Sequence, residues 1–525
     1  MRHCVCGLLL SLLLVSIVDA ENGAPAKGTI LYRETFETTN ALAGWSGNGT
    51  LEAGYNGGKS LAVESGPGKR GSIFSRSLPA ASWRGCTVRG VGMVRAREVE
   101  KKPHPWNGIK FMLVVQGPNG TTYPQAPLET GTFEWQKASF RIQIPQETTN
   151  LVVVLGLEEV EGKVWFDNLE FRVDKLPAPR PPPVLTGPIF KGRSQDRLRG
   201  AMVSPNIDAE SLKVLGSVWH ANLIRFQLIR SGRAGQASGL DDYDPWLEGE
   251  LQKLDRALPS CKQYGIKVVV DLHSPPGGKA TAGGYMGSDA GLFRDPRAQE
   301  KFVQVWTKIA KRYKDATPIW GYDLANEPVE EDVGEDCEDW QGLAERTAKA
   351  IRAIDPVRAI IIEPTGWGGP DGFKDFAPLP VSNVVYSVHM YVPSAFTHQG
   401  VFEQGTPCEY PGQIQGKLWD KSALEATLKP VIDFQERYRV HIYVGEFSAI
   451  RWAPNQSAQR YLSDLIQIFE AHGWDWSYHA FREWQGWSVE HGDRREETAP
   501  ASSPTSRQRL LREWFDKNQK PASGG

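Results

Sequence analysis

Cysteine is scarce in this chain of 525 residues, and no two of its six cysteines are spaced as C-x-x-C. The absence of that pair argues against a zinc knuckle, and the absence of any His-x-His argues against a metal-dependent hydrolase with paired histidine ligands. No long run of charges of one sign occurs, and the net charge is only -2. Nothing therefore indicates nucleic acid or an acidic membrane surface as a partner, and we expect a neutral one.

Long apolar runs are also absent, apart from a short one near the N-terminus. Arg2 and His3 precede the apolar residues 8–18, and small residues follow up to Ala20. This is the pattern of a secretory signal, and the run is too short to span a membrane. We expect a signal peptide over residues 1–20, a secreted protein (extracellular or periplasmic) and no membrane association after the signal is removed.

Removal of the signal would leave four cysteines. A disulfide between Cys337 and Cys408 and a set of free buried thiols are both compatible with the spacing, and the sequence does not choose between them.

Two stretches with the same design dominate what is present. Residues 319–328 form an apolar and aromatic run that ends in Asn326-Glu327-Pro328, and residues 441–448 form a short β-rich run that ends around Glu446. The proline stops the strand and favours an extended backbone at Glu327. Two glutamates at strand ends indicate a hydrolase in which one carboxyl is a general acid and the other a nucleophile.

Residues 28–174 contain short strand-like runs separated by Gly, Pro and Asn, which predicts a β-sandwich. The expected strands are residues 29–36, 60–64, 86–96, 108–116, 135–144, 151–157 and 162–171. The last of these resembles the closing strand of jelly-roll carbohydrate-binding modules. That resemblance allows a structural calcium near Asp167, although an aspartate at a strand end is otherwise an ordinary turn residue. Sugar-stacking candidates, of which at least half are expected in the core, are Trp45, Trp83, Trp106 and Trp135.

Five prolines between residues 175 and 184 predict an extended linker over residues 175–190. The region 191–518 follows as a second domain. We expect a polar tail over about residues 496–507 and disorder over residues 521–525.

Within that second domain, eight strand-like runs alternate with amphipathic helical stretches. The runs are residues 198–203, 223–229, 267–273, 319–325, 359–363, 384–391, 441–447 and 476–481. The helical stretches include residues 299–314, 341–354, 422–438 and 457–472. This pattern predicts an α/β fold, a (β/α)8 TIM barrel. A doubly wound open sheet is the alternative, but the glycine-rich phosphate loop typical of that fold is missing.

The ends of these strands carry polar residues that a barrel would gather on one face. The sequence here resembles glycoside hydrolase family 5, the cellulase-type group, over about residues 197–514. The matching motifs are Asn222-Leu223-Ile224-Arg225, Val270-Asp271-Leu272-His273, Ala325-Asn326-Glu327-Pro328, Val388-His389-Met390-Tyr391 and Val444-Gly445-Glu446-Phe447.

The resemblance implies a retaining β-glycoside hydrolase, with Glu327 as acid and then base and Glu446 as nucleophile. It places Tyr391 and Arg225 on Glu446, the former to orient it and the latter to keep it ionised. Further substrate-binding residues implied by the resemblance are Asn326, for the sugar 2-hydroxyl, with His273, His389, His479 and Trp484. Asp271, Asp323 and Glu363 are expected to be structural carboxylates, and catalysis is expected to need no metal or cofactor.

One departure from the family concerns the eighth strand, which usually ends in a tryptophan that stacks on sugar. His479 stands in that place here, so Trp484 or Trp487 is expected to supply the platform. The long loop 393–419 is expected to close one end of the groove.

The expected substrate is a β-linked polysaccharide or oligosaccharide, with β-1,4-glucan first, and the expected state is a monomer. Mannanase, exo-acting β-glucosidase and transglycosylase activities remain alternatives within the family. A non-catalytic carbohydrate-binding protein is a further alternative.

Overall fold

The computed structural model describes residues 25–69, 71–118, 120–175, 196–230, 239–278, 291–330, 333–334, 336–401 and 406–518. The chain divides into two compact units, Met1–Ala178 and Pro179–Gly525. The expected signal peptide and disordered end, and the expected linker beyond residue 175, lie outside the described residues.

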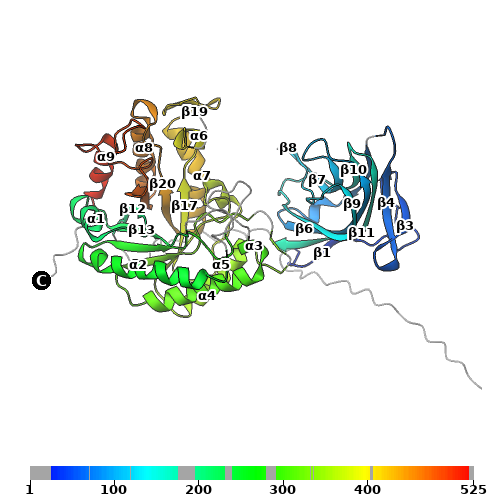
Figure 1. Cartoon of the computed structure of the whole chain (residues 1–525), viewed down its shortest axis with the longest axis horizontal. Helices are drawn as coiled ribbons and strands as arrows, with labels where there is room; N and C mark the ends of the chain where they lie inside the picture. The colour runs from blue at the N-terminus through cyan, green and yellow to red at the C-terminus, as the bar shows by residue number, and fades with distance from the viewer. Residues whose placement is uncertain are drawn as a thin grey trace, which may run out of the picture. The chain divides into compact units, whose positions relative to one another are not determined.

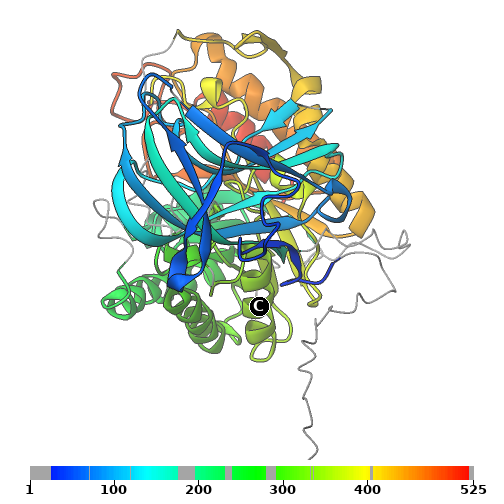
Figure 2. The ribbon, with the colours of Figure 1, turned by 90° about the vertical axis from the view of Figure 1, so that its right-hand side faces the viewer.

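The first unit consists of two antiparallel sheets, as the predicted β-sandwich requires (Figures 1 and 2). One sheet has the order β3-β4-β11-β6-β9, with β1 also paired to β11, and the other has the order β2-β5-β10-β7-β8. The strands are β1 Ile30–Glu34, β2 Ser46–Gly47, β3 Thr50–Ala53, β4 Lys59–Ser65, β5 Gly71–Leu78, β6 Thr87–Val99, β7 Gly108–Gly117, β8 Gly120–Thr122, β9 Gly131–Gln143, β10 Asn150–Glu158 and β11 Gly162–Lys175. Two short 3-10 helices, η1 Tyr55–Gly57 and η2 Ala80–Ser82, connect them.

The four tryptophans proposed for sugar stacking divide between core and surface. Trp83 is fully buried, and Trp45 stacks on Phe74 with ring centroids 5.0 Å apart. Trp106 is 60% exposed and Trp135 is half-buried. Trp45 is half-buried as well, but Phe74 covers one of its faces, so Trp106 and Trp135 are the better candidates to present an aromatic face to a ligand.

The second unit is a closed barrel of eight parallel strands, which confirms the predicted TIM barrel. Its strands are β12 Arg199–Val203, β13 Leu223–Gln227, β14 Lys267–Asp271, β15 Ile319–Asp323, β16 Ala359–Ile362, β17 Val384–Met390, β20 His441–Phe447 and β21 Asp475–Phe481. A hairpin of β18 Gly412–Ile414 and β19 Lys417–Trp419 interrupts the loop after β17.

Helices surround the barrel. They are α1 Ala209–Lys213, η3 Val214–Val218, α2 Tyr243–Gln263, α3 Gly291–Arg294, α4 Pro296–Tyr313, α5 Trp340–Arg352, η4 Pro370–Lys374, α6 Ser394–Thr397, α7 Lys421–Tyr438, η5 Pro454–Gln456, α8 Ser457–Ala471 and α9 Ser506–Phe515. Local sequence explains their starts: Asp295 accepts the Arg297 N–H at 2.9 Å ahead of α4, whose first residue is proline.

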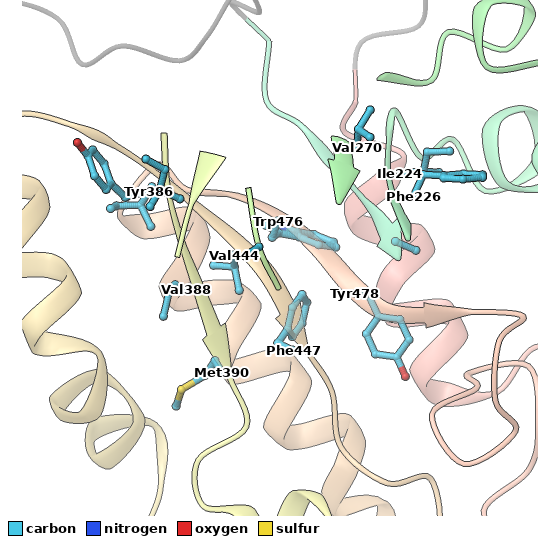
Figure 3. Packing of buried hydrophobic residues seen from close by; sticks show 14 of the residues in the cluster. Ile224, Phe226, Val270, Tyr386, Val388, Met390, Val444, Phe447, Trp476 and Tyr478 are labelled. Atoms are coloured by element: carbon cyan, nitrogen blue, oxygen red, sulfur yellow. The ribbon is translucent and has the colours of Figure 1, made fainter. Parts of the chain in front are cut away.

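Alternation along the barrel strands sends every second side chain outward. Ile224 and Phe226 of β13, which lie near Val270 of β14, belong with Val388 of β17 and Trp476 of β21 to the cluster of buried residues that the barrel shares with its helices (Figure 3). The intervening residue Arg225 points the other way, into the barrel. This alternation delivers the polar residues of the strands to one interior.

The polar tail expected over about residues 496–507 is wrong. Helix α9 begins at Ser506, and Arg507, which is 1% exposed, donates to the Ser488 carbonyl at 2.8 Å.

The sequence left open a disulfide between Cys337 and Cys408. The thiol of Cys408 donates to the Ala395 carbonyl at 3.4 Å, so no disulfide joins it to Cys337. None of the helices that the structure describes is long and apolar enough to cross a membrane.

Candidate active site

Eight polar side chains from the barrel strands and their ends share one interior. The set comprises Arg225 of β13, His273 after β14, Asn326 and Glu327 after β15, His389 and Tyr391 at the end of β17, Glu446 of β20 and His479 of β21. These eight are the catalytic and substrate-binding residues expected from the sequence, apart from Trp484.

Glu446 accepts two hydrogen bonds, lies beside a histidine and is 5% exposed. Arg225 Nη1 donates to its Oε1 at 2.6 Å, the Tyr391 hydroxyl donates to its Oε2 at 2.8 Å, and His479 Nδ1 lies 3.2 Å from Oε2. Burial alone would raise the pKa of Glu446. His389, His479 and Arg225 outweigh that effect and hold the pKa well below its usual range, so Glu446 is a carboxylate ready to act as a nucleophile.

Arg225 is fully buried and lies among four carboxylates. The N–O distances are 3.0 Å to Asp271, 2.9 Å to Asp323, 3.0 Å to Glu363 and 2.6 Å to Glu446. One guanidinium cannot neutralise four carboxylates. Burial and the neighbouring acids raise the pKa of Asp323 well above its usual range, so this carboxyl group carries a proton that lowers the charge of the cluster.

Hydrogen bonds around Asn326 fix the orientation of its amide. Arg225 Nη2 donates to Asn326 Oδ1 at 3.1 Å, so the Nδ2 group faces His273 Nε2 at 3.2 Å as a donor. His273 Nε2 is therefore an acceptor, and its Nδ1–H donates to Asp271 Oδ2 at 2.8 Å. The second amide hydrogen of Asn326 remains available for a ligand.

Glu327 differs in environment from Glu446, being 19% exposed and next to a histidine. His389 Nδ1 donates to Glu327 Oε1 at 3.0 Å, and the Glu327 backbone N–H donates to Glu363 Oε2 at 2.8 Å. The backbone of Glu327 has φ of 47°, so the extended conformation expected before Pro328 is wrong. The bond to Glu363 holds this left-handed backbone, a conformation that proteins tolerate mainly at functional sites.

The two glutamates face each other. One ligand atom each from Glu327, His389 and Glu446 lie within 4.8 Å of one another, which makes this trio the candidate metal cluster among the described residues. His389 is the histidine of this trio. Burial lowers the pKa of His389, but the surrounding glutamates raise it well above its usual value, so its ring is a cation. A metal ion at this trio would have to displace the proton of that ring, so the trio fits an acid and base pair better than a metal centre.

A family model, "Cellulase (glycosyl hydrolase family 5)", matches residues 190–483. The chain belongs to glycosyl hydrolase family 5. It is 32% identical over 270 residues to endoglucanase C of Acetivibrio thermocellus, covering 45% of this chain and 75% of that protein. It is also 28% identical over 232 residues to cellodextrinase A of Ruminococcus flavefaciens, covering 43% and 66%. A crystal structure of Thermotoga maritima Cel5A with cellobiose is 23% identical, with a TM-score of 0.45 over 60% of this chain and 96% of that one.

Membership of glycosyl hydrolase family 5 makes the chain a glycoside hydrolase and the interior of its barrel the candidate active site. Of the two tryptophans expected to replace the family platform, Trp484 is 38% exposed and Trp487 only 8%. Trp487 packs against the rings of Tyr391, His398 and His479 at 5.1–6.0 Å. Only Trp484 therefore has a face to offer a sugar.

Part of the long loop after β17 reaches the candidate active site. His398 packs edge-on to Tyr391 at 5.2 Å, and burial lowers the pKa of His398 to about 4, so its ring is neutral. The end of the loop is fixed elsewhere, because Tyr410 donates to Asp464 of α8 at 2.6 Å.

The sequence analysis missed two residues of this candidate active site, Gln227 and Glu483. Gln227 Nε2 donates to Glu483 Oε2 at 2.8 Å, and the same oxygen lies 3.5 Å from His479 Nε2. Gln227 could have been found, since it follows Arg225 at the period of two that points inward. Glu483 lies in a loop, where no periodicity reports side-chain direction.

Proposed function

We propose that the protein is a retaining hydrolase of β-1,4-glucan, with Glu446 as nucleophile and Glu327 as acid and then base. The observation that carries this proposal is the close approach of the two carboxyl groups, one oxygen of each lying within 4.8 Å of one oxygen of the other. A double displacement needs carboxyl groups roughly 5–5.5 Å apart, whereas an inverting enzyme leaves roughly 6.5–9.5 Å for a water molecule. The difference in burial between the two glutamates supports their different roles.

In the first step, a Glu446 oxygen bonds to the anomeric carbon while the bond to the leaving oxygen breaks and Glu327 donates its proton to that oxygen. In the second step, water attacks the anomeric carbon and gives a proton to Glu327. The bond to Glu446 breaks with its electron pair returning to the carboxylate. Arg225 and Tyr391 hold Glu446 in one orientation through both steps, at 2.6 Å and 2.8 Å.

The substrate proposal rests on the polar and aromatic side chains next to this pair. Asn326 offers an amide hydrogen to the 2-hydroxyl of the reacting sugar, while His273 and His389 line its subsite. Trp484 offers an exposed ring for stacking. Relatives named endoglucanase and cellodextrinase favour β-1,4-linked glucose over other β-glycosides.

The test is reducing-sugar release from soluble β-glucans, mannans, xylans and cello-oligosaccharides, with Glu446→Gln measured beside the wild type. We expect release from a β-1,4-glucan that is lost in the variant, with the β-anomer as the first product by proton NMR. An α-anomer formed first would contradict the retaining mechanism. Activity on mannan, release of glucose only from chain ends, or formation of longer oligosaccharides would instead identify a mannanase, an exo-acting β-glucosidase or a transglycosylase.

An EDTA arm of the same assay separates metal-dependent from metal-free hydrolysis. We expect unchanged turnover, because the residues of the candidate metal cluster are already engaged with one another. Loss of turnover that zinc or calcium restores would contradict this expectation.

We propose further that the first unit binds carbohydrate and that a calcium ion stabilises it. The Asp167 carboxylate is 1% exposed and accepts the Tyr55 and Asn168 N–H groups at 2.8 and 2.6 Å. Burial and nearby Glu37 raise the pKa of Asp167, so two acidic groups share this corner and a divalent cation would relieve their repulsion. A fall in the melting temperature of this unit with EDTA, reversed by calcium, is the expected result; an unchanged melting temperature would contradict it.

We also propose that residues 1–20 direct export of the protein and that the protein is a monomer. N-terminal sequencing of protein from the culture medium tests the first, and light scattering of the purified protein tests the second.

A further inference from the structure

The eighth barrel strand ends in a histidine with a partner on each side. His479 Nδ1 lies 3.2 Å from Glu446 Oε2, and His479 Nε2 lies 3.5 Å from Glu483 Oε2. The side chains of His479 and Glu483 are 15% and 27% exposed. A tryptophan, which the family usually has here, could not pair with a carboxylate on both sides.

Glu483 is held in place from the opposite side. Gln227 of β13, 2% exposed, donates to Glu483 Oε2 at 2.8 Å. A row of hydrogen bonds and ion pairs therefore runs from Gln227 through Glu483 and His479 to Glu446. A side chain that only contacted substrate would not need such an anchor.

The hydrogen-bond directions show where the protons are. The Tyr391 hydroxyl donates its only hydrogen to Glu446, so its oxygen can only accept from His479 Nδ1, with which it is in contact. The other ring nitrogen, Nε2, faces the Glu483 carboxylate. Both nitrogens therefore carry hydrogen, and His479 is an imidazolium. The electrostatics agree: burial lowers the pKa of His479, but Glu446 and Glu483 raise it to about 10.

We propose that His479 and Glu483 are positioning residues for the nucleophile: Glu483 keeps His479 cationic, and that cation makes Glu446 a better leaving group in the second step. The inference rests on the proposed double displacement and adds residues to it that the family pattern does not supply.

The charge changes in the two steps explain why the second depends more on His479. Forming the bond between Glu446 and the anomeric carbon removes the negative charge of Glu446, so a neighbouring cation gives no advantage there. When water attacks the anomeric carbon, the bond to Glu446 breaks, the electron pair returns to Glu446 and the water proton passes to Glu327. The regenerated carboxylate is stabilised by the imidazolium beside it.

The groups that face the pair set its titration. His479 faces Glu446 of β20, Tyr391 beyond β17 and Glu483, and its charge contributes to the lowered pKa of His398. Glu483 faces His479 and His273, and the charge and hydrogen bond of His479 lower the pKa of Glu483 against the effect of its burial. Among these groups Glu483 is the one whose charge can be removed without altering the nucleophile or its tyrosine partner.

Glu483→Gln removes that charge at constant shape, and His479→Asn keeps a neutral N–H near the position of Nδ1. The first measurement is the NMR titration of His479 in protein labelled with 13C-histidine, assigned by its loss in His479→Asn. We expect a wild-type pKa above 9 and a fall of at least about one unit in Glu483→Gln. An unchanged pKa in that variant would overturn the proposal.

The second measurement is steady-state kinetics on dinitrophenyl cellobioside, whose good leaving group makes the second step rate-limiting. In both single variants we expect kcat and KM to fall together by up to about tenfold, with kcat/KM within about twofold of wild type. The double variant should match His479→Asn, because Glu483 acts through His479. Additive losses, or a fall in kcat/KM alone, would show that Glu483 contacts substrate directly and would overturn the proposal that it acts through His479.

Glu490→Gln is the matched control on the same loop. Glu490 pairs with Arg482 at 2.9 Å and has no part in the row of contacts to Glu446, so this variant should keep wild-type kinetics. Melting curves identify variants that fail to fold, and either single variant tests the claim alone.

The variant Glu446→Gln distinguishes a failure of the proposed function from a failure of this inference alone. If Glu446→Gln keeps wild-type turnover, the proposed function fails. If Glu446→Gln is inactive while the Glu483 and His479 variants behave as wild type, only this inference fails.

Discussion

His389 Nδ1 lies 3.0 Å from Glu327 Oε1, and the Nε2 atom of the same ring lies 3.1 Å from Glu363 Oε1. Because the pKa of His389 is well above its usual value, the ring is a cation between two carboxyl groups. It can therefore favour the ionised form of Glu327, which the second chemical step needs, while Glu446 favours the protonated form that the first step needs. In the proposed mechanism, the two functions of Glu327 thus correspond to two neighbours of opposite charge.

Glu327→Gln should affect substrates according to their leaving groups. Cleavage of a β-1,4-glucan needs a proton on the leaving oxygen, so we expect its kcat/KM to fall by about 10²–10⁴. Dinitrophenyl cellobioside needs no such proton, and its kcat/KM should fall far less. Comparison of the two substrates on one preparation is the measurement, and an equal loss on both would contradict the acid role.

Arg225→Met should destabilise the barrel strongly. The substitution leaves four carboxyl groups, all 5% exposed or less, without their shared cation, and breaking a buried ion pair costs about 3–5 kcal/mol. Arg346→Met is the control, because Arg346 is 37% exposed in its pairs with Glu300 and Glu338, and exposed pairs contribute less than about 1 kcal/mol. Scanning calorimetry of the barrel transition measures both. Equal losses would show that the buried cluster adds no stability of its own.

His479 should make the stability of the barrel depend on alkaline pH. Its pKa is raised from 6.5 to about 10 on folding, so between these values the folded state holds a proton that the unfolded state has lost. Its contribution is complete below about pH 6.5 and is lost as the pH rises through about 10. We expect the difference in melting temperature between the wild type and His479→Asn to shrink across that window. A constant difference would contradict a charged His479.

The barrel could be predicted from the sequence because parallel strands, buried on both faces, are continuous apolar runs. The polar residues at the ends of these runs also predicted most of the candidate site. The antiparallel sandwich was harder. Strand β5 was missed because Gly71–Leu78 carries several serines and an arginine, and its burial comes from neighbouring strands rather than from its own composition.

Segments held by hydrogen bonds to arginine gave no sequence signal at all. Residues 496–507 look like a tail because they have little apolar periodicity, yet Arg451 donates to the Gly492 carbonyl at 2.6 Å and to the Glu497 carbonyl at 2.7 Å. Glu483, in the loop before this region, was missed because that loop also has no periodicity that reports side-chain direction. The left-handed backbone of Glu327 was beyond local rules because Glu363, a residue from the next strand, stabilises it.

Trp106→Ala and Trp135→Ala test the proposed carbohydrate binding of the first unit. Both rings are accessible, and we expect each change to weaken adsorption of the protein to insoluble cellulose without altering its melting temperature. Trp83→Ala is the contrast, since Trp83 is fully buried and its truncation should cost about 3–5 kcal/mol of stability. Depletion assays and calorimetry measure these effects. Adsorption that survives both surface substitutions would contradict a site at these rings.

The most direct test of the proposed mechanism is to trap its covalent intermediate. A 2-deoxy-2-fluoro cellobioside with a dinitrophenyl leaving group slows both steps, but its leaving group still lets the first one proceed, so the glycosyl-enzyme accumulates. Peptide mass spectrometry should then find one fluorosugar per chain, attached to Glu446, and none on Glu446→Gln. A label on any other residue, or steady turnover with no labelled peptide, would contradict Glu446 as the nucleophile of a retaining hydrolase.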